Sequence, residues 1–163
     1  MYKQNIARIN YTTYDVRRGQ DVFNPSTSHC NVMVFTGTLN GTQNPNIIHP
    51  FGYARVLGIY HVNVICAGPG MTDYQPRRMD FLWVRWYQRI DSIDAGWCAR
   101  RLDCLQFPVV DREDAFGFID PSDVLRCCHI VPAFSKGMAH TDGRGFSFSA
   151  RDSSDWAAYY VNR

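Results

Sequence analysis

Cysteine and histidine residues are the first candidates for chemistry in this sequence, because thiolate and imidazole groups bind zinc. Cys98 and Cys104 are separated by five residues, and Cys127-Cys128-His129 follows later. In extended strands Cys98 and Cys104 share a face, as Cys127 and His129 do, so these four can meet across strands. Structural zinc sites, however, normally use C-x2–4-C knuckles. We therefore expect free thiols that act as small hydrophobic groups, no metal and no other cofactor, with the four-residue zinc site as the alternative.

A nucleophilic site needs a hydroxyl, thiol or carboxylate next to a base such as histidine. His61 and His129 are the candidate bases, with cysteine, serine and many aspartate residues as conceivable neighbours. No nucleophile elbow, phosphate-binding loop, dinucleotide fingerprint or H-E-x-x-H motif accompanies them. The pair Asp120 and Asp123 fits a cap or turn without chemistry. The sequence therefore assigns no catalytic residue, and a hydrolase or nuclease using His61 or His129 is the alternative to a non-enzymatic protein.

Aromatic and arginine side chains give the stronger signal for binding. Most aromatic residues of a β protein fill its core, but any that face solvent beside an arginine provide a stacking or cation–π surface. The candidate partner-binding residues are Tyr53, Arg55, Trp83, Arg85, Trp86, Tyr87, Arg89 and Trp97.

These candidates lie in or next to two apolar runs that have the pattern of strands. Residues 52–64 and 81–89 alternate between two sets of side chains and are rich in valine, isoleucine, tyrosine and tryptophan. A repeat of two with this composition is typical of a β-strand. Gly70 and Pro76 interrupt the chain between the runs, so we expect an antiparallel pair joined by a long loop.

Shorter elements are expected on both sides of this pair. Strands are predicted at residues 11–21, 30–35, 97–107 and 126–134, the first running into a turn. Asp120 is a good N-cap and Pro121 suits the first helical position, which predicts one helical turn there. Asn40-Gly41 predicts a type I′ hairpin turn. Residues 156–161 are expected to form a short helix.

Composition restricts the class of protein. The chain has 163 residues, 45% hydrophobic and 20% charged, which suits one globular domain. All but two of the 17 basic residues are arginine, and Glu113 is the only glutamate among the 15 acidic residues. Lysine and glutamate favour exposed helices, so their scarcity indicates a β-rich protein. The net charge of +2 gives no overall electrostatic case for nucleic acid, which stays a secondary expectation.

The ends of the chain suggest where it works. The N-terminal residues contain no apolar run that resembles a signal peptide, and no segment approaches the roughly 20 apolar residues of a membrane span. We therefore expect an intracellular protein with free thiols and no membrane partner. The apolar, aromatic residues 159–161 are typical of a fragment, or of a structural subunit that docks its end on a larger assembly.

Three segments resemble the bromo-adjacent homology (BAH) domain, a β-barrel module of chromatin proteins. They are residues 53–59 (YARVLGI), 82–89 (LWVRWYQR) and 120–132 (DPSDVLRCCHIVP), in the order and spacing of that family. Gln88 stands where the family usually has an aromatic residue, and Ile90 replaces its proline. The resemblance implies a barrel core at about residues 50–134 and a protein or chromatin partner.

The chain as a whole is similar to open reading frames of large transposon-like elements in mushroom-forming fungi. The shared segments are residues 14–21, 79–86 and 115–121, which occur there in the same order. This resemblance implies a mobile-element origin and a nuclear setting, but it implies no reaction.

Together these features predict a mostly β protein that forms a single domain over residues 1–163. We expect a small BAH-like barrel of about six strands with one short helix, flanked by irregular arms at residues 1–49 and 135–163. The expected function is that of a non-enzymatic interaction module that binds protein or chromatin through the aromatic and arginine residues named above. A hydrolase or nuclease and a structural subunit are the alternatives.

Overall fold

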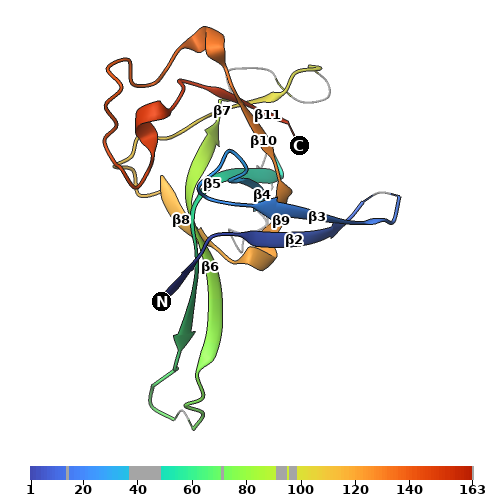
Figure 1. Cartoon of the computed structure of the whole chain (residues 1–163), viewed down its shortest axis with the longest axis vertical. Coiled ribbons are helices and arrows are strands. Elements are labelled where there is room, and N and C mark those ends of the chain that lie inside the picture. The colour runs from blue at the N-terminus through green and yellow to red at the C-terminus, as the bar shows by residue number, and fades with distance from the viewer. Residues whose placement is uncertain (14, 37–48, 71, 91–94, 96–98, 163) are drawn as a thin grey trace.

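The structure, a computed structural model, describes residues 1–13, 15–36, 49–70, 72–90, 95 and 99–162. Its strands (Figure 1) are β1 (Tyr2–Gln4), β2 (Ala7–Thr12), β3 (Arg18–Phe23), β4 (Asn31–Phe35), β5 (Phe51–Val64), β6 (Arg77–Arg89), β7 (Asp103–Gln106), β8 (Phe116–Ile119), β9 (Val124–Cys127), β10 (His129–Pro132) and β11 (Tyr159–Asn162). The described helices are single 3-10 turns, namely η1 (Pro121–Asp123), η2 (Phe134–Lys136) and η3 (Asp152–Ser154). The prediction of a mostly β protein is confirmed, and η1 confirms the helical turn predicted after Asp120. Among the described residues, no helix has the length and apolar character needed to cross a membrane.

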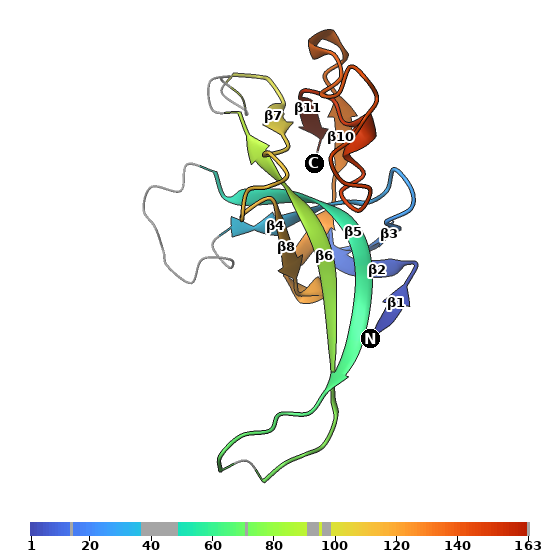
Figure 2. The same cartoon turned by 90° about the vertical axis from the view of Figure 1, so that its left-hand side faces the viewer.

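The predicted strand pair is the longest element of the fold. β5 and β6 run antiparallel from the pair Tyr53–Tyr87 to the pair Val64–Arg77, with one register shift in β5. Their far ends project from the body of the protein as a two-stranded arm (Figures 1 and 2). The alternating sequence explains this pairing, because each strand places one set of side chains on either face. The prediction of an antiparallel pair with a long loop is confirmed.

The other strands assemble on this pair. The main sheet has the order β10-β11-β7-β6-β5-β4-β9, β1 adds to β5, β8 adds to β6, and β2 pairs with β3 in a separate sheet. Within the described residues, the end strands β9 and β10 do not pair with each other, so the sheet is open and the predicted barrel is wrong. The physical reason lies in their partners. Although β9 and β10 are consecutive in the chain, β9 pairs with β4 and β10 pairs with β11.

The two flanks expected to be irregular instead supply strands. β4 lies between β5 and β9, and β11 lies between β7 and β10, so both flanks are built into the main sheet. β4 confirms the strand predicted at 30–35, whereas the helix predicted at 156–161 is wrong because its residues enter β11. The segment 11–21 contributes to a hairpin, β2–β3, rather than to one strand. The turn predicted at Asn40-Gly41 lies outside the described residues.

The main sheet carries apolar side chains on both faces. One face packs against the β2–β3 hairpin in a cluster that includes Phe23, Leu82 and Val84, which we call the hairpin core. On the other face, side chains of β4, β5 and β6 pack with those of β7 and β11 of the same sheet, in a cluster that includes Tyr87 and Leu105, which we call the C-terminal core. β6 contributes to both cores because successive side chains of a strand point to opposite faces.

Gly117, in the middle of β8, is expected to be intolerant of a side chain. A Cβ atom there would lie 2.5 Å from Nε1 of Trp86, whose ring packs on the hairpin core. We expect Gly117→Ala to lower the free energy of unfolding by about 1–3 kcal/mol, measured by urea denaturation. In a Trp86→Leu background the same substitution is expected to cost much less, because the ring is gone. Equal losses in both backgrounds would contradict this steric explanation.

Candidate functional site

A buried carboxylate between two arginines joins the C-terminal segment to the centre of the sheet. Asp155 accepts a hydrogen bond from Nη1 of Arg55 at Oδ1 (2.7 Å) and one from Nη1 of Arg85 at Oδ2 (2.5 Å). Only 3% of the Asp155 side chain and 4% of the Arg85 side chain are exposed, against 15% for Arg55. Arg55 and Arg85 are cross-strand partners in β5 and β6. One aspartate therefore holds both strands to the C-terminal segment.

Phe107 packs against both cations of this cluster. Its ring centroid lies 3.9 Å from Cζ of Arg85 and 4.4 Å from Cζ of Arg55. Tyr87 stacks on Phe107, with 4.1 Å between ring centroids. The electron-rich face of an aromatic ring attracts a cation, so Phe107 partly replaces the water that the two buried guanidinium groups have lost.

Tyr159 connects the same carboxylate to the backbone of the C-terminal segment. Its hydroxyl donates to Oδ1 of Asp155 (3.1 Å) and accepts a hydrogen bond from the amide of Trp156 (2.8 Å). Burial raises the pKa of Tyr159, and the negative charge of Asp155 adds to this effect. The phenol therefore stays protonated at neutral pH and continues to donate to Asp155.

This cluster contains or adjoins four of the eight predicted partner-binding residues. Tyr53, Arg85 and Tyr87 are buried, and Arg55 is held in the ion pair with Asp155. These four residues stabilise the interior and present little surface to a partner.

The other four predicted residues have different positions. Trp83 and Trp86 lie on opposite faces of β6, since they are three residues apart in a strand. Trp86 packs on the hairpin core, whereas Trp83 stacks on Phe116 with 6.2 Å between ring centroids. Arg89 is the last residue of β6 and is partly buried. Trp97 lies outside the described residues.

Five aromatic side chains lie on one face of β5, β6 and β8. The C-terminal segment covers the neighbouring part of the same face. We call this surface the aromatic face, and its residues are Tyr60, Phe81, Trp83, Phe116 and Phe118. Phe81 stacks on Tyr60 and meets Phe118 edge-on, with 5.6 Å between centroids in each case. Strand register explains the cluster, because Tyr60 lies opposite Phe81 and Trp83 lies opposite Phe118. Phe118 is 68% exposed and the other four rings are partly buried, so the face meets solvent mainly at Phe118.

β8 is an edge strand, because in the described part of the chain it pairs with β6 alone. Just before β8, the amide of Trp86 donates to the carbonyl of Ala115. Hydrogen-bonded and non-bonded pairs alternate along an antiparallel ladder, so Phe116 and Phe118 direct their N–H and C=O groups away from β6. The free edge of β8 can therefore accept another strand.

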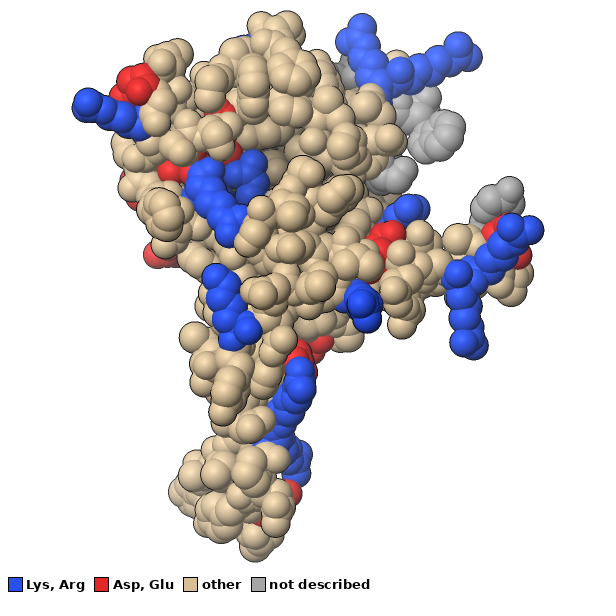
Figure 3. Space-filling view, in the orientation of Figure 1, with Lys and Arg blue, Asp and Glu red and all other residues tan. Residues whose placement is uncertain are grey.

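Acidic side chains flank this free edge. The acidic residues between positions 111 and 123 are Asp111, Glu113, Asp114, Asp120 and Asp123, and the single basic residue in that stretch is Arg112. Hydrogen bonds from Ser122 lower the pKa of Asp120, which keeps it ionised. At the other edge of the aromatic face, Lys3 lies opposite Tyr60. The segment that contains β8 thus carries a net negative charge, whereas Figure 3 shows charges of both signs over the molecule.

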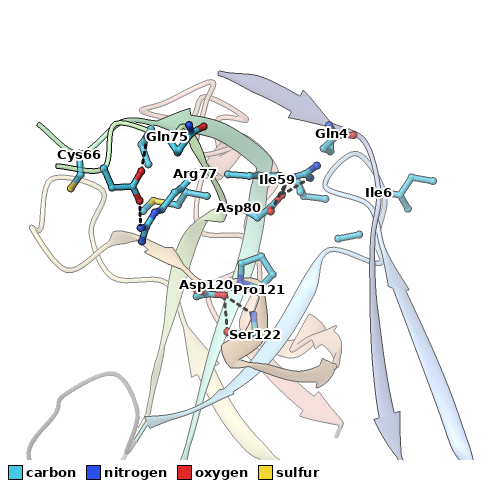
Figure 4. Close-up of a pocket in the computed structure, with 15 residues that line it drawn as sticks. Gln4, Ile6, Ile59, Cys66, Gln75, Arg77, Asp80, Asp120, Pro121 and Ser122 are labelled. Carbon is cyan, nitrogen blue, oxygen red and sulfur yellow. Dashed lines mark hydrogen bonds and ion pairs between the residues drawn. The ribbon is translucent and has the colours of Figure 1, made fainter. Parts of the chain in front are cut away.

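A groove of about 970 Å³ lies between the arm, β1 and η1 (Figure 4). Four of its five charged side chains form ion pairs, Asp73 with Arg77 and Asp80 with Arg78, each at 2.7 Å, and the fifth is Asp120. The amide of Gln75 and the guanidinium of Arg77 lower the pKa of Asp73, and Arg78 lowers that of Asp80. No histidine is among the described residues that line the groove. Ser122 likewise lowers the pKa of Asp120, so these contacts keep the three carboxyl groups of the groove ionised.

The predicted zinc ligands lie in different parts of the structure. Cys104 is buried in a small core cluster, whereas Cys127 and His129 line a surface pocket of about 330 Å³. Cys98 lies outside the described residues. Across the positions that the structure describes, no three histidine, cysteine or acidic residues are arranged to hold a metal ion.

The histidines of the predicted hydrolase or nuclease also lie apart. His61 is in β5, where its Nδ1 is 3.1 Å from Nε2 of Gln4, and His129 is in β10. Burial raises the pKa of Cys127 to about 11 and that of Cys128 to about 12, so both thiols near His129 stay protonated at neutral pH. The structure thus gives these histidines no activated thiol among the described residues.

Several residues that define the site were missed from sequence. Asp155 follows a run of polar residues that reads as a helix cap, and nothing local marks it as the partner of two distant arginines. Phe107 lies at the end of a predicted strand without a distinguishing motif. Phe116 and Phe118, however, alternate with Gly117 in an apolar run, and this alternation is a signal that both rings lie on one face.

Comparisons with protein family models, with curated proteins and with solved structures give no match to this chain. Its function is therefore inferred from the aromatic face and the free edge of β8.

Replacing the shared carboxylate tests how much of the fold depends on it. Asp155→Asn removes the negative charge that two buried guanidinium groups share, so we expect the free energy of unfolding to fall by about 3–5 kcal/mol in urea. The control is Asp114→Asn, which breaks an exposed pair with Arg112 and is expected to leave stability nearly unchanged. Similar small effects of the two substitutions would show that the buried cluster is not essential.

Proposed function

We propose that this domain is a non-enzymatic interaction module that binds an extended, basic segment of another protein along the free edge of β8. The supporting observation is the aromatic face, a cluster of partly exposed rings beside the unpaired edge of β8. Exposed apolar patches with polar rims mark interaction sites on soluble proteins. A partner bound there would remove these rings from water.

Strand addition is the binding mode that fits this edge. A partner strand would pair with the outward N–H and C=O groups of Phe116 and Phe118, which provides affinity without dependence on side chains. Every second side chain of that strand would then lie over the aromatic face, close to Phe118 and Trp83. An arginine or lysine at such a position gains about 0.5–2 kcal/mol from contact with a ring. These interactions need no cofactor.

Charge favours a basic partner at this edge. The acidic residues on both sides of β8 attract a basic segment and repel an acidic one, which speeds encounter and excludes wrong partners. Lys3, at the opposite edge of the aromatic face, would repel the same segment. The partner is therefore expected along β8 rather than along β1.

The sequence resemblances agree with this proposal. The three BAH-like segments favour a chromatin protein as the source of the basic segment. The similarity to mobile-element reading frames favours an intracellular, nuclear setting.

The alternative of a structural subunit that docks its C-terminal residues elsewhere has less support. Tyr159 and Val161 are 3% and 2% exposed, because β11 is an internal strand of this domain's own sheet. The aromatic end is therefore used inside the fold.

Peptide binding tests the proposed module. The probe is a fluorescein-labelled, end-blocked peptide that alternates arginine with valine, and its matched control carries glutamate in place of arginine. We expect binding of the basic peptide alone, and Phe118→Ala is expected to weaken it about tenfold by fluorescence anisotropy. Phe148→Ala is the matched control variant, since Phe148 is a fully exposed phenylalanine (101%) that belongs to no described ring cluster.

Three outcomes would contradict the proposal: no binding of the basic peptide, a preference for the acidic one, or equal weakening by both phenylalanine substitutions. A nucleosome pull-down then identifies the source of the segment. Capture by the wild type and loss with Phe118→Ala would support chromatin. Peptide binding without nucleosome capture would support the interaction module and exclude chromatin as its partner.

A further inference from the structure

The β2–β3 hairpin is a two-stranded sheet of its own that projects from the body of the protein (Figure 1). Its paired residues run from Ala7–Phe23 to Thr12–Arg18. Ala7, Ile9 and Phe23 turn inward to the hairpin core, so the hairpin is anchored along one face. Basic side chains stand out along this projection and at its tip in Figure 3.

The outward face of the hairpin has an unusual composition. Its residues, all exposed, are Arg8, Asn10 and Thr12 from β2 and Arg18, Gln20 and Val22 from β3. Two arginines, two amides, a hydroxyl and one small apolar group thus share a surface that carries no aromatic ring and no carboxylate.

The nearby carboxylates are engaged elsewhere. Asp21 is on the inward face, where Oδ2 accepts a hydrogen bond from the amide of Cys127 (2.8 Å). Asp15 lies near the tip and pairs with Arg17 (3.2 Å). Arg8 and Arg18 have no ion pair among the residues that the structure describes, so both cations are available to an external anion.

The two amides form a rung at the centre of this face. Nε2 of Gln20 donates to Oδ1 of Asn10 (2.9 Å), and the two residues are cross-strand partners. This bond leaves the amide nitrogen of Asn10 as a free donor and the amide oxygen of Gln20 as a free acceptor. Base edges in the major groove of DNA offer partners for either group, such as the N7 acceptor and the N6 donor of adenine.

The arginines lie on either side of this rung. Arg8 is two residues from Asn10 in β2, and Arg18 is two residues from Gln20 in β3, on the other side of the amide pair. At about 3.4 Å per residue, the two arginines are about 14 Å apart along the hairpin. Cations at the two ends of a polar rung can contact phosphates while the amides reach base edges. The groove is about 12 Å wide and admits a two-stranded β-ribbon.

We infer that the outward face of β2–β3 binds double-stranded DNA by entering its major groove. Charge complementarity favours this ligand, because the face is cationic and its amides can donate to and accept from base edges. Single-stranded nucleic acid is disfavoured, because its bases bind by stacking on aromatic rings, and Tyr11 of this hairpin points inward. The inference uses a surface separate from β8 and does not depend on the proposed peptide binding.

Fluorescence anisotropy with a labelled mixed-sequence duplex of about 20 base pairs, from about 25 to about 200 mM salt, tests the inference. We expect the double variant Arg8→Gln/Arg18→Gln to bind about tenfold more weakly at low salt. The slope of log K against log salt is expected to become shallower by about 2, because two phosphate contacts are lost. The matched control is Arg112→Gln/Arg144→Gln, two exposed arginines away from the hairpin, which is expected to keep wild-type affinity. Circular dichroism melting confirms that each variant is folded.

Sequence readout provides a second test. Asn10→Ala/Gln20→Ala is expected to keep the salt dependence while reducing the differences in affinity among duplexes of different sequence. The inference is overturned if the wild type does not bind duplex DNA at low salt, or if both arginine double variants lose the same affinity. It is also overturned if a single strand of the same sequence binds as tightly as the duplex.

Discussion

The burial of Asp155 between Arg55 and Arg85 is the interaction on which the arrangement of this protein depends. Asp155 is 100 residues from Arg55 and 70 from Arg85 in the sequence, yet it contacts both. Buried charges are costly unless they are paired and packed, and Phe107 supplies packing for both guanidinium groups. This requirement restricts the C-terminal segment to one half of the sheet face. The other half, with Trp83 and its neighbouring rings, stays open.

Much of the fold could be predicted because its information is local. The period of two in β5 and β6 predicted the central pair, and the cap formed by Asp120 and Pro121 predicted η1. The choice between an open sheet and a barrel could not be predicted, because it depends on which strands pair with β9 and β10. The ion pairs of Arg55 and Arg85 with Asp155 could not be predicted for a similar reason. An arginine beside aromatic residues has the same local sequence whether it is buried in an ion pair with a distant aspartate or exposed to solvent.

The structure separates two surfaces of opposite character. The aromatic face ends at β8 among acidic residues, and the β2–β3 hairpin presents Arg8 and Arg18 without a facing carboxylate. The net charge of +2 does not reveal this difference, because the acidic residues around β8 and the arginines of the hairpin cancel in the sum. Each surface also uses the backbone differently. β8 offers unpaired N–H and C=O groups, whereas the hairpin is already paired and offers side chains alone.

Amide hydrogen exchange, followed residue by residue by NMR with and without the basic peptide, tests most directly whether a partner strand adds to β8. If it does, the N–H groups of Phe116 and Phe118 become protected on binding, while that of Gly117, which faces β6, changes little. Protection at β1 or β10 instead, with Phe116 and Phe118 still exchanging as in the free protein, would contradict binding at the β8 edge.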